Sequence, residues 1–223
     1  LEVETDRIAN SVQQIRTNRI SSADTEWDKY WCTLRDPDHT RYQIITDGVA
    51  MRGSDTAPGM GGSPTMLATR QKEMDFDINC RLRLLRGEAG ISLFVNDDHH
   101  HDLFAKRTED GRITVGTRVC IEGLSAIVES KTLEETEEAI TLQIAAYADR
   151  YVYTVVLDGN RKIELGESRT KYLSSEVSGD CFGVMIGLYS YNPETSGGDE
   201  TTAIFSHVEC EFLPDGRQAH QSD

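Results

Sequence analysis

The sequence predicts an all-β protein, folded as an antiparallel β-sandwich or jelly roll. Apolar and polar residues alternate with a period of two through most of residues 74–212, as strands with one buried face require. Turn-forming residues separate these runs, so that strands recur about every 10 to 15 residues. Helical periodicity is scarce, and a chain of 223 residues is within the size of a single sandwich. We therefore expect one large β domain.

The predicted strands follow one another in chain order. They cover residues 74–84, 89–95, 113–115, 119–121, 151–157, 162–165, 182–188 and 204–212. The first is the clearest, because its apolar residues from Met74 to Leu84 alternate with Asp, Asn and Arg. We expect Gly116 and Thr117 to join two short strands, and Asp158-Gly159-Asn160 is a strong hairpin signal.

Three segments carry no clear strand pattern. Residues 53–66 are rich in Gly, Pro, Ser and Thr and predict a long loop, a kind of segment that is often functional in compact domains. Residues 128–140 are compatible with a helical turn or two, but their Glu cluster favours a solvated loop or the tip of an edge strand. The stretch 4–20 is polar and lacks a continuous apolar stripe, so we expect an extended arm rather than a second domain.

The charge balance excludes several kinds of partner. Lys and Arg number 23 against 38 Asp and Glu, which gives a formal net charge of -15. Proteins that bind nucleic acid or anionic membranes need clustered Lys and Arg, so we expect neither partner. No run approaches the roughly 18 apolar residues of a membrane-spanning helix. Residues 1–16 carry acids and no apolar core, so we expect no signal peptide.

The cysteines bear on both folding and compartment. They are Cys32, Cys80, Cys120, Cys181 and Cys210. An odd number of scattered cysteines without a Cys-x-x-Cys pair argues against a zinc site or a disulfide framework. We expect buried free thiols, above all at Cys80 and Cys210, which occupy apolar strand positions. The sequence also has no Asn-x-Ser/Thr glycosylation signal. Both features favour an intracellular protein, with a secreted one as the alternative.

The most unusual tract is 96–102, which reads Asn-Asp-Asp-His-His-His-Asp. Imidazoles and carboxylates are ligands of metal sites, but in a strand His99 and His101 face one way and His100 the other. We therefore expect a hairpin turn with exposed histidines, one of which enters the next strand. A histidine that contacts a ligand and a genuine metal site are the alternatives.

Other polar and aromatic residues are candidates for binding. Arg70 and Gln71 lie just before the clearest strand, where a guanidinium can hold a carbonyl, a carboxylate or a sugar hydroxyl. The aromatic residues gather at Trp27, Tyr30, Trp31 and Tyr42, and again at Tyr189 and Tyr191. Aromatic faces stack on sugar rings, and the alternative for these side chains is a place in the core.

Signatures of catalysis are missing. The sequence has no Gly-x-Ser-x-Gly elbow, no His-Glu-x-x-His and no P-loop. Two acidic pairs, Asp75 with Asp77 and Glu134 with Glu138, fall on the polar side of amphipathic stretches, so we expect them to be solvated. A glycosidase needs two carboxylates that face each other across a cleft, and nothing marks such a pair. We therefore assign no catalytic residue, metal or cofactor.

A series of short motifs resembles a known family. In chain order these are Trp31-x-x-Leu34-Arg35-Asp36-Pro37, residues 48–54 (Gly-Val-Ala-Met-Arg-Gly-Ser), Leu67-Ala68-Thr69-Arg70-Gln71, Glu88-Ala89-Gly90-Ile91, His100-His101-Asp102-Leu103, and the strands around Gly187-Leu188-Tyr189 and Ala203-Ile204-Phe205. They resemble the C-terminal β-sandwich module of glycoside hydrolase family 43, the β-xylosidase and α-L-arabinofuranosidase group. Thr69 stands where that family usually has Arg, and Ser206 where Asp is common.

The resemblance covers about residues 24–213 and implies a concanavalin A-like jelly roll. It implies that residues 1–23 form an arm or linker from a missing catalytic domain and residues 214–223 a C-terminal tail. In such enzymes an N-terminal five-bladed propeller carries the catalytic carboxylates, and a loop of the sandwich helps to close the sugar pocket. Here that loop would be the segment 54–66, with Met60 or Met66 at its apolar tip.

Three functional hypotheses follow. The first is a non-catalytic module that supports the propeller and partly caps its pocket for xylan- or arabinan-derived oligosaccharides. The second is a free-standing, lectin-like sugar-binding module with its site on a concave face. The third is a self-sufficient carbohydrate-active enzyme on a jelly roll, such as a lyase. The candidate ligand-binding residues are Arg70, Gln71, Glu88, His100, Tyr189 and Met60.

Overall fold

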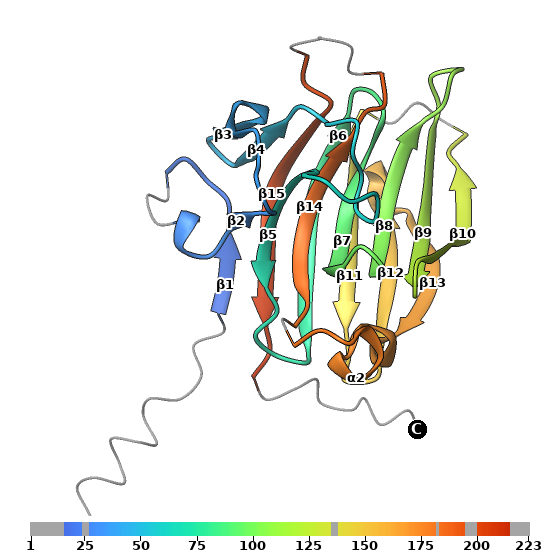
Figure 1. Cartoon of the computed structure of the whole chain (residues 1–223). Helices are drawn as coiled ribbons and strands as arrows, with labels where there is room; N and C mark the ends of the chain where they lie inside the picture. The colour runs from blue at the N-terminus through green and yellow to red at the C-terminus, as the bar shows by residue number, and fades with distance from the viewer. Residues whose placement is uncertain (1–15, 24–26, 135–137, 182, 195–199, 215–223) are drawn as a thin grey trace, which may run out of the picture.

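The computed structural model describes residues 16–23, 27–134, 138–181, 183–194 and 200–214. Two sheets pack face to face, and the strands that are neighbours in each sheet run antiparallel (Figure 1). The predicted all-β antiparallel sandwich is thereby confirmed. The short helices of the described residues lie outside the sheets, and α2 (Ser175–Ser178) closes one end of the sandwich.

Among the described residues, one sheet has eight strands and the other has seven. The order in the first is β13 (Lys162–Arg169), β12 (Arg150–Val156), β11 (Ile140–Ala146), β6 (Phe76–Leu84), β15 (Ala203–Phe212), β4 (Gly48–Met51) and β3 (Tyr42–Ile45), with β1 (Arg16–Arg19) paired to β15. The order in the second is β10 (Leu124–Thr132), β9 (Ile113–Ile121), β8 (His99–Arg107), β7 (Glu88–Asn96), β14 (Met185–Tyr191), β5 (Thr65–Arg70) and β2 (Cys32–Thr33). Short 3-10 turns cover Trp27–Lys29, His39–Arg41, Asp158–Asn160 and Thr170–Leu173.

The main core lies between the sheets and is built by the alternation seen in the sequence. In β6, Phe76, Ile78, Cys80 and Leu82 are fully buried, while the residues that alternate with them face outwards. The same pattern holds in β12, where Tyr151 and Tyr153 point into the core. The strands predicted at 74–84, 89–95, 151–157 and 204–212 are confirmed, as is the turn that leads from 158–160 into the return strand.

The prediction of two short strands around Gly116 is wrong. Residues 113–121 form the single strand β9, with Gly116 inside it. A Cβ atom at position 116 would lie 2.6 Å from the carbonyl oxygen of Glu129 and 2.7 Å from the Phe104 ring. Glycine is therefore present because two neighbours approach the backbone, and not because the chain turns there.

The prediction of a histidine-rich turn is also wrong. Only Asp97 and Asp98 form the turn between β7 and β8, and all three histidines are buried at the start of β8. Their alternation is as expected, since His101 faces the core and His100 the other side of the sheet. Residues 96–102 could all belong to a long turn. The actual hairpin turn takes only two residues, so the histidines lie in the strand that follows it.

Several smaller expectations can be compared with the structure. Residues 128–132 continue edge strand β10 rather than forming a helix. Asp75 was predicted to be solvated, and this is wrong because its side chain is buried. Glu134 and Glu138 are exposed as predicted. Cys80, Cys120 and Cys210 are buried free thiols, whereas Cys32 and Cys181 are exposed. The predicted arm 1–23 falls partly outside the described residues, and its end, β1 with the buried Ile20, belongs to the sandwich. None of the described helices is long and apolar enough to cross a membrane.

Candidate functional site

The outer face of the seven-stranded sheet, which points away from the main core, is itself covered near its centre. Strand β7 is buried on both sides from residue 88 to residue 95. A second apolar cluster lies on the outer face and consists of Met66, Ala68, Phe94, Phe104 and Tyr189. Leu34, Met185 and Tyr191 pack against this cluster from the rim. Residues that would be solvated on an ordinary sheet surface are therefore enclosed here.

A charged network lies beside this apolar cluster. The guanidinium of Arg118 in β9 donates to both carboxylate oxygens of Glu88, at 2.9 and 3.1 Å, and to Asp102 at 3.0 Å. Tyr189 donates its hydroxyl to Glu88 at 2.8 Å. The guanidinium also stacks over the ring of Phe104 at 4.8 Å. We call Arg118, Glu88, Asp102, Tyr189 and His100 the Arg118 network.

Asp102 and Arg118 stay ionised in the network despite their burial. Burial alone would raise the pKa of Asp102, but His100 and Arg118 hold it below its ordinary value. Burial likewise works to lower the pKa of Arg118, and its neighbours Tyr189, Glu88 and Asp102 raise it above the ordinary value. Both side chains therefore remain charged at neutral pH.

His100 links the network to the loop between β4 and β5, residues 52–64. Its Nδ1 atom lies 3.1 Å from Asp102, and its ring stacks on Phe94 at 6.1 Å. The side chain is almost fully buried, and its Nε2 edge points towards Gly59 of the β4–β5 loop. This edge-on contact places the loop directly on the network.

A cavity of about 260 Å³ opens between the β4–β5 loop and strands β8 to β10. Its lining residues are Ala57, Pro58, Gly59, Met60, Glu88, His100, Arg118, Cys120, Gly123, Ser125 and Tyr191. One wall is apolar and comes from the loop, and the other carries the polar atoms of the Arg118 network. An apolar wall opposite a few fixed polar groups is the usual make-up of a small-molecule site.

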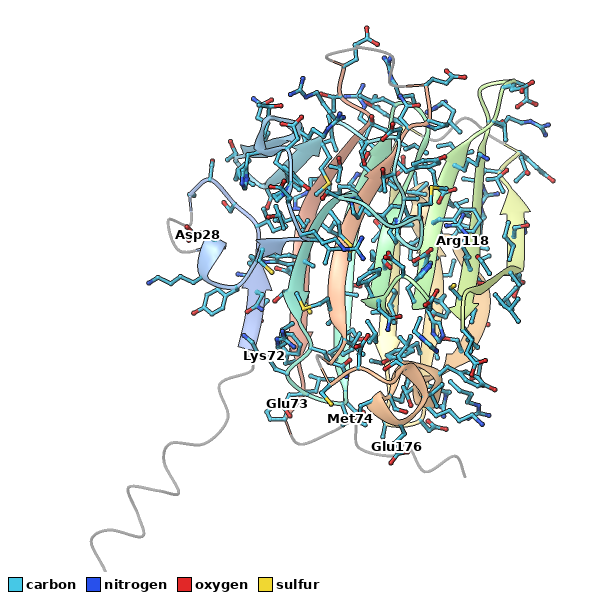
Figure 2. The ribbon with its side chains drawn as sticks, viewed as in Figure 1. Asp28, Lys72, Glu73, Met74, Arg118 and Glu176 are labelled. Atoms are coloured by element: carbon cyan, nitrogen blue, oxygen red, sulfur yellow. The ribbon has the colours of Figure 1, made fainter. Side chains whose placement is uncertain are left out.

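The candidate residues from the sequence divide into two groups. Met60, Glu88 and His100 line the cavity together, and Tyr189 lies beneath it, bonded to Glu88. Arg70 and Gln71 lie at the far end of β5, next to Lys72–Met74, which Figure 2 shows well separated from Arg118. Gln71 lines another hollow there, of about 700 Å³, with Lys171 and Tyr151. Met66, the other expected loop tip, is buried in the outer apolar cluster instead.

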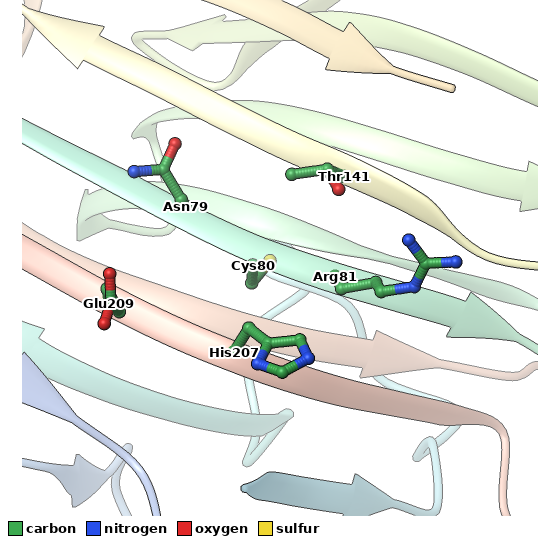
Figure 3. A pocket seen from close by; sticks show the side chains of 6 residues that line it. All are labelled: Asn79, Cys80, Arg81, Thr141, His207 and Glu209. Carbon is green, nitrogen blue, oxygen red and sulfur yellow. The ribbon is translucent and has the colours of Figure 1, made fainter. Parts of the chain in front are cut away.

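Another hollow lies on the outer face of the eight-stranded sheet (Figure 3). It measures about 510 Å³ and is lined by Asn79, Cys80, Arg81, Thr141, His207 and Glu209. Its charged side chains are occupied by surface ion pairs, because Arg81 pairs with Asp158 and His207 with Asp47. This hollow therefore lacks the enclosed polar network of the cavity under the β4–β5 loop. Within the described ranges, no group of three or more His, Cys, Asp or Glu residues is placed to hold a metal ion.

Arg118 is the central residue of the site, and sequence reasoning missed it. Its position in an alternating strand predicts an ordinary solvent-facing arginine. A usable signal was the pair Glu88 and Asp102, since each stands directly before apolar strand residues and a buried carboxylate needs a cation or hydrogen-bond donors. The pairing of β7 with β8 and of β8 with β9 then brings the acids to Arg118.

Comparisons with known proteins agree with this architecture. The family model described as "Beta xylosidase C-terminal Concanavalin A-like domain" matches residues 23–211. A non-reducing end alpha-L-arabinofuranosidase of Bacteroides ovatus is 25% identical over 166 residues, which cover 72% of this chain and 31% of that protein. The chain therefore spans less than a third of the length of this curated relative.

Solved structures show the same fold. A family 43 protein from the xyloglucan utilisation locus of Bacteroides ovatus superimposes with a TM-score of 0.71 at 19% identity, covering 90% of this chain and 38% of that one. A xylan beta-1,4-xylosidase from Bacillus halodurans superimposes with a TM-score of 0.75 at 14% identity, covering 90% and 39%. In both cases the match is to one part of a longer chain.

Proposed function

The chain belongs to the family of β-xylosidase C-terminal concanavalin A-like domains, and on that premise we propose that it supports a separate catalytic propeller and partly caps its sugar pocket. It is a family 43 glycoside hydrolase module, and its relatives are longer enzymes that act on carbohydrates. Under this proposal, catalysis belongs to the propeller, and this chain contributes one wall of the pocket.

Met60 carries the proposal. It lies in the β4–β5 loop with 61% of its surface exposed, although much of the same loop, including Ser54 and Ala57, is buried. An exposed methionine on an anchored loop is suited to contact the apolar face of a sugar ring. The relatives' names favour pentose substrates, and we propose xylan- or arabinan-derived oligosaccharides as the ligands.

Replacing Met60 by alanine in the complete hydrolase should lower kcat/KM by about tenfold, the usual value of one lost apolar contact in a substrate pocket. The measurement is hydrolysis of aryl pentosides and pentose oligosaccharides by the purified enzyme. Met74→Ala is a matched control, because Met74 is 60% exposed but lies at the end of the sandwich away from the β4–β5 loop. Equal kinetics in the two variants would argue against the capping role.

A sugar-binding module is the second candidate, and the cavity beneath the β4–β5 loop favours it. Glu88, His100 and Arg118 present polar atoms opposite Met60 in a space of about 260 Å³, and Tyr191 lies beside Glu88 in the neighbouring strand. Isothermal titration of this chain with xylo- and arabino-oligosaccharides, with chromatography of the products, separates the hypotheses. Binding without turnover supports the sugar-binding module, and turnover supports a self-sufficient enzyme. If neither binding nor turnover is detected, the accessory role remains.

Arg70 remains a separate proposal, because it lies away from the cavity at the end of β5. We expect Arg70→Ala to weaken sugar binding or hydrolysis in the intact protein. Affinity from titration and kcat/KM from hydrolysis are the two readouts, and unchanged values would remove Arg70 from the site.

A further inference from the structure

The base of the β4–β5 loop is tied to the sheets on both of its limbs. Ser54 donates its hydroxyl to the carbonyl of Thr56 at 2.9 Å and accepts from the amide of Thr65 at 3.0 Å. The carbonyl of Ser54 also accepts from the amide of Asn192 at 2.8 Å, just beyond β14. These bonds fix where the loop leaves and rejoins the sandwich, but leave its tip undetermined.

Arg35 holds the returning limb of the loop. Its guanidinium donates to the carbonyl of Gly62 and pairs with the Asp97 carboxylate in the β7–β8 turn at 2.5 Å. Arg35 has a φ of 57°, in the left-handed region that disfavours residues other than glycine. A backbone that would suit glycine thus carries a long side chain that bridges the loop and the turn.

His100 supports the middle of the loop. Gly59 has a φ of +85°, and a Cβ atom there would lie 2.5 Å from Nε2 of His100 and 3.2 Å from the carbonyl oxygen of Asp97. The imidazole cannot easily move aside, because Asp102 bonds it on one edge and Phe94 stacks on its face. Gly59 therefore packs on a ring that the Arg118 network holds in place.

We propose that Arg35 and His100 are positioning residues that set the shape of the β4–β5 loop and so present Met60 as a preformed wall. Arg35, the clamp, bonds to position 62, and His100, the support, lies against position 59, so the two contacts fall on either side of Met60. A lid that closes on its ligand would instead have few contacts with its surroundings. A preformed wall also spares the ligand the entropic cost of ordering the loop.

The proposal concerns the shape of the loop in this chain and rests on the proposed function only for what Met60 touches. Its tests therefore need neither substrate nor a catalytic domain. Two signals report on the loop tip: exchange of the Met60 amide, which donates to the carbonyl of Ala57 at 3.2 Å, and the ¹³C resonance of the Met60 methyl group. The variant Met60→Leu assigns that methyl resonance.

The first experiment compares Gly59→Ala with Gly61→Ala. Both positions have a positive φ, at +85° and +72°, but a Cβ at position 61 meets nothing within 4 Å. We expect Gly59→Ala to speed exchange of the Met60 amide by about tenfold or more over Gly61→Ala, as local opening becomes easier. Adding His100→Ala should remove most of this difference, because the ring at 2.5 Å is gone and only the Asp97 carbonyl oxygen at 3.2 Å remains. Equal effects of the two glycine variants, or a difference undiminished by His100→Ala, would overturn the role of His100 in supporting the loop.

The second experiment compares Arg35→Ala with Arg35→Lys. Lysine keeps the charge that pairs with Asp97 but lacks the planar fork that bonds two acceptors at once. We expect Arg35→Ala to shift and broaden the Met60 methyl resonance and Arg35→Lys to restore it in part. Arg112→Ala is the matched control, because Arg112 pairs with Asp110 in an exposed turn at 2.7 Å. A Met60 signal unchanged in Arg35→Ala, or changed as much by Arg112→Ala, would contradict the clamp.

These outcomes are separable from those for the capping role. A loop that loosens as expected while Met60→Ala leaves hydrolysis unchanged would support the positioning residues and overturn the cap. A loop insensitive to Arg35 and His100, in an enzyme impaired by Met60→Ala, would do the reverse.

Discussion

Replacing Arg118 by alanine is expected to destabilise the module by about 3–5 kcal/mol, the usual cost of removing one partner from a buried ion pair. Only 19% of the Arg118 side chain is exposed, and those of Glu88 and Asp102 are 6% and 0% exposed. Without the guanidinium, two carboxyl groups remain buried against the apolar cluster of Phe104 and Tyr189. Urea unfolding at pH 7, followed by circular dichroism, measures the free energy of unfolding.

Two further variants test whether the loss comes from the buried charges. Arg81→Ala breaks an exposed pair with Asp158 and should cost about 0.2–1 kcal/mol. The triple change Arg118→Met, Glu88→Gln and Asp102→Asn removes all the charges together, so it should recover much of the stability lost in Arg118→Ala. A single Arg118 variant no less stable than Arg81→Ala would show that the network contributes little to folding.

Acidification from pH 7 to pH 4.5 is expected to cost about 2–3 kcal/mol of stability through His101 alone, at 1.36 kcal/mol for each unit of pKa shift. His101 lies in the main core, where Nδ1 bonds Ser168 at 2.7 Å and Tyr151 packs against its ring at 6.1 Å. Burial lowers its pKa from 6.5 to about 4, although Asp102 works in the opposite direction. The folded protein therefore holds this imidazole neutral.

The sign follows from which state binds the proton. Below pH 6.5 the unfolded chain protonates His101, whereas the folded chain does so only near pH 4. The contribution of His101 to the free energy of unfolding is thus fully present above pH 6.5 and is lost as the pH falls from 6.5 towards 4. The lowered pKa of Asp102 acts in a different window, because its stabilising effect is lost only near and below its ordinary value of 3.8.

The control for this prediction is His101→Gln, which keeps a neutral polar side chain at every pH. Urea unfolding of both proteins at pH 7.0, 5.5 and 4.5 gives the difference between their stabilities. Wild type should lose about 2–3 kcal/mol more than the variant over this range. Parallel curves for the two proteins would contradict the buried neutral state of His101.

The fold was predictable because it depends on local periodicity. The alternation in β6 and β12 fixes which side of each strand is buried, and the turn at Gly159 fixes where β12 returns. The errors occurred where a residue has a meaning that depends on distant neighbours. Gly116 looked like a turn, but its neighbour is the Phe104 ring across the sheet, and the histidines looked exposed because polar tracts usually are.

The sequence alone determined the all-β class, the main strands, the family resemblance and the presence of a loop with Met60. Tertiary structure alone decided which polar residues act together. Glu88, Asp102 and Arg118 come from three strands, and only the pairing registers of β7, β8 and β9 bring them within hydrogen-bonding distance. The β4–β5 loop lies against His100 at Gly59, and Arg35, from another part of the chain, joins it to the β7–β8 turn. Contacts between residues far apart in sequence leave no periodicity behind, so no single strand pattern could have revealed them.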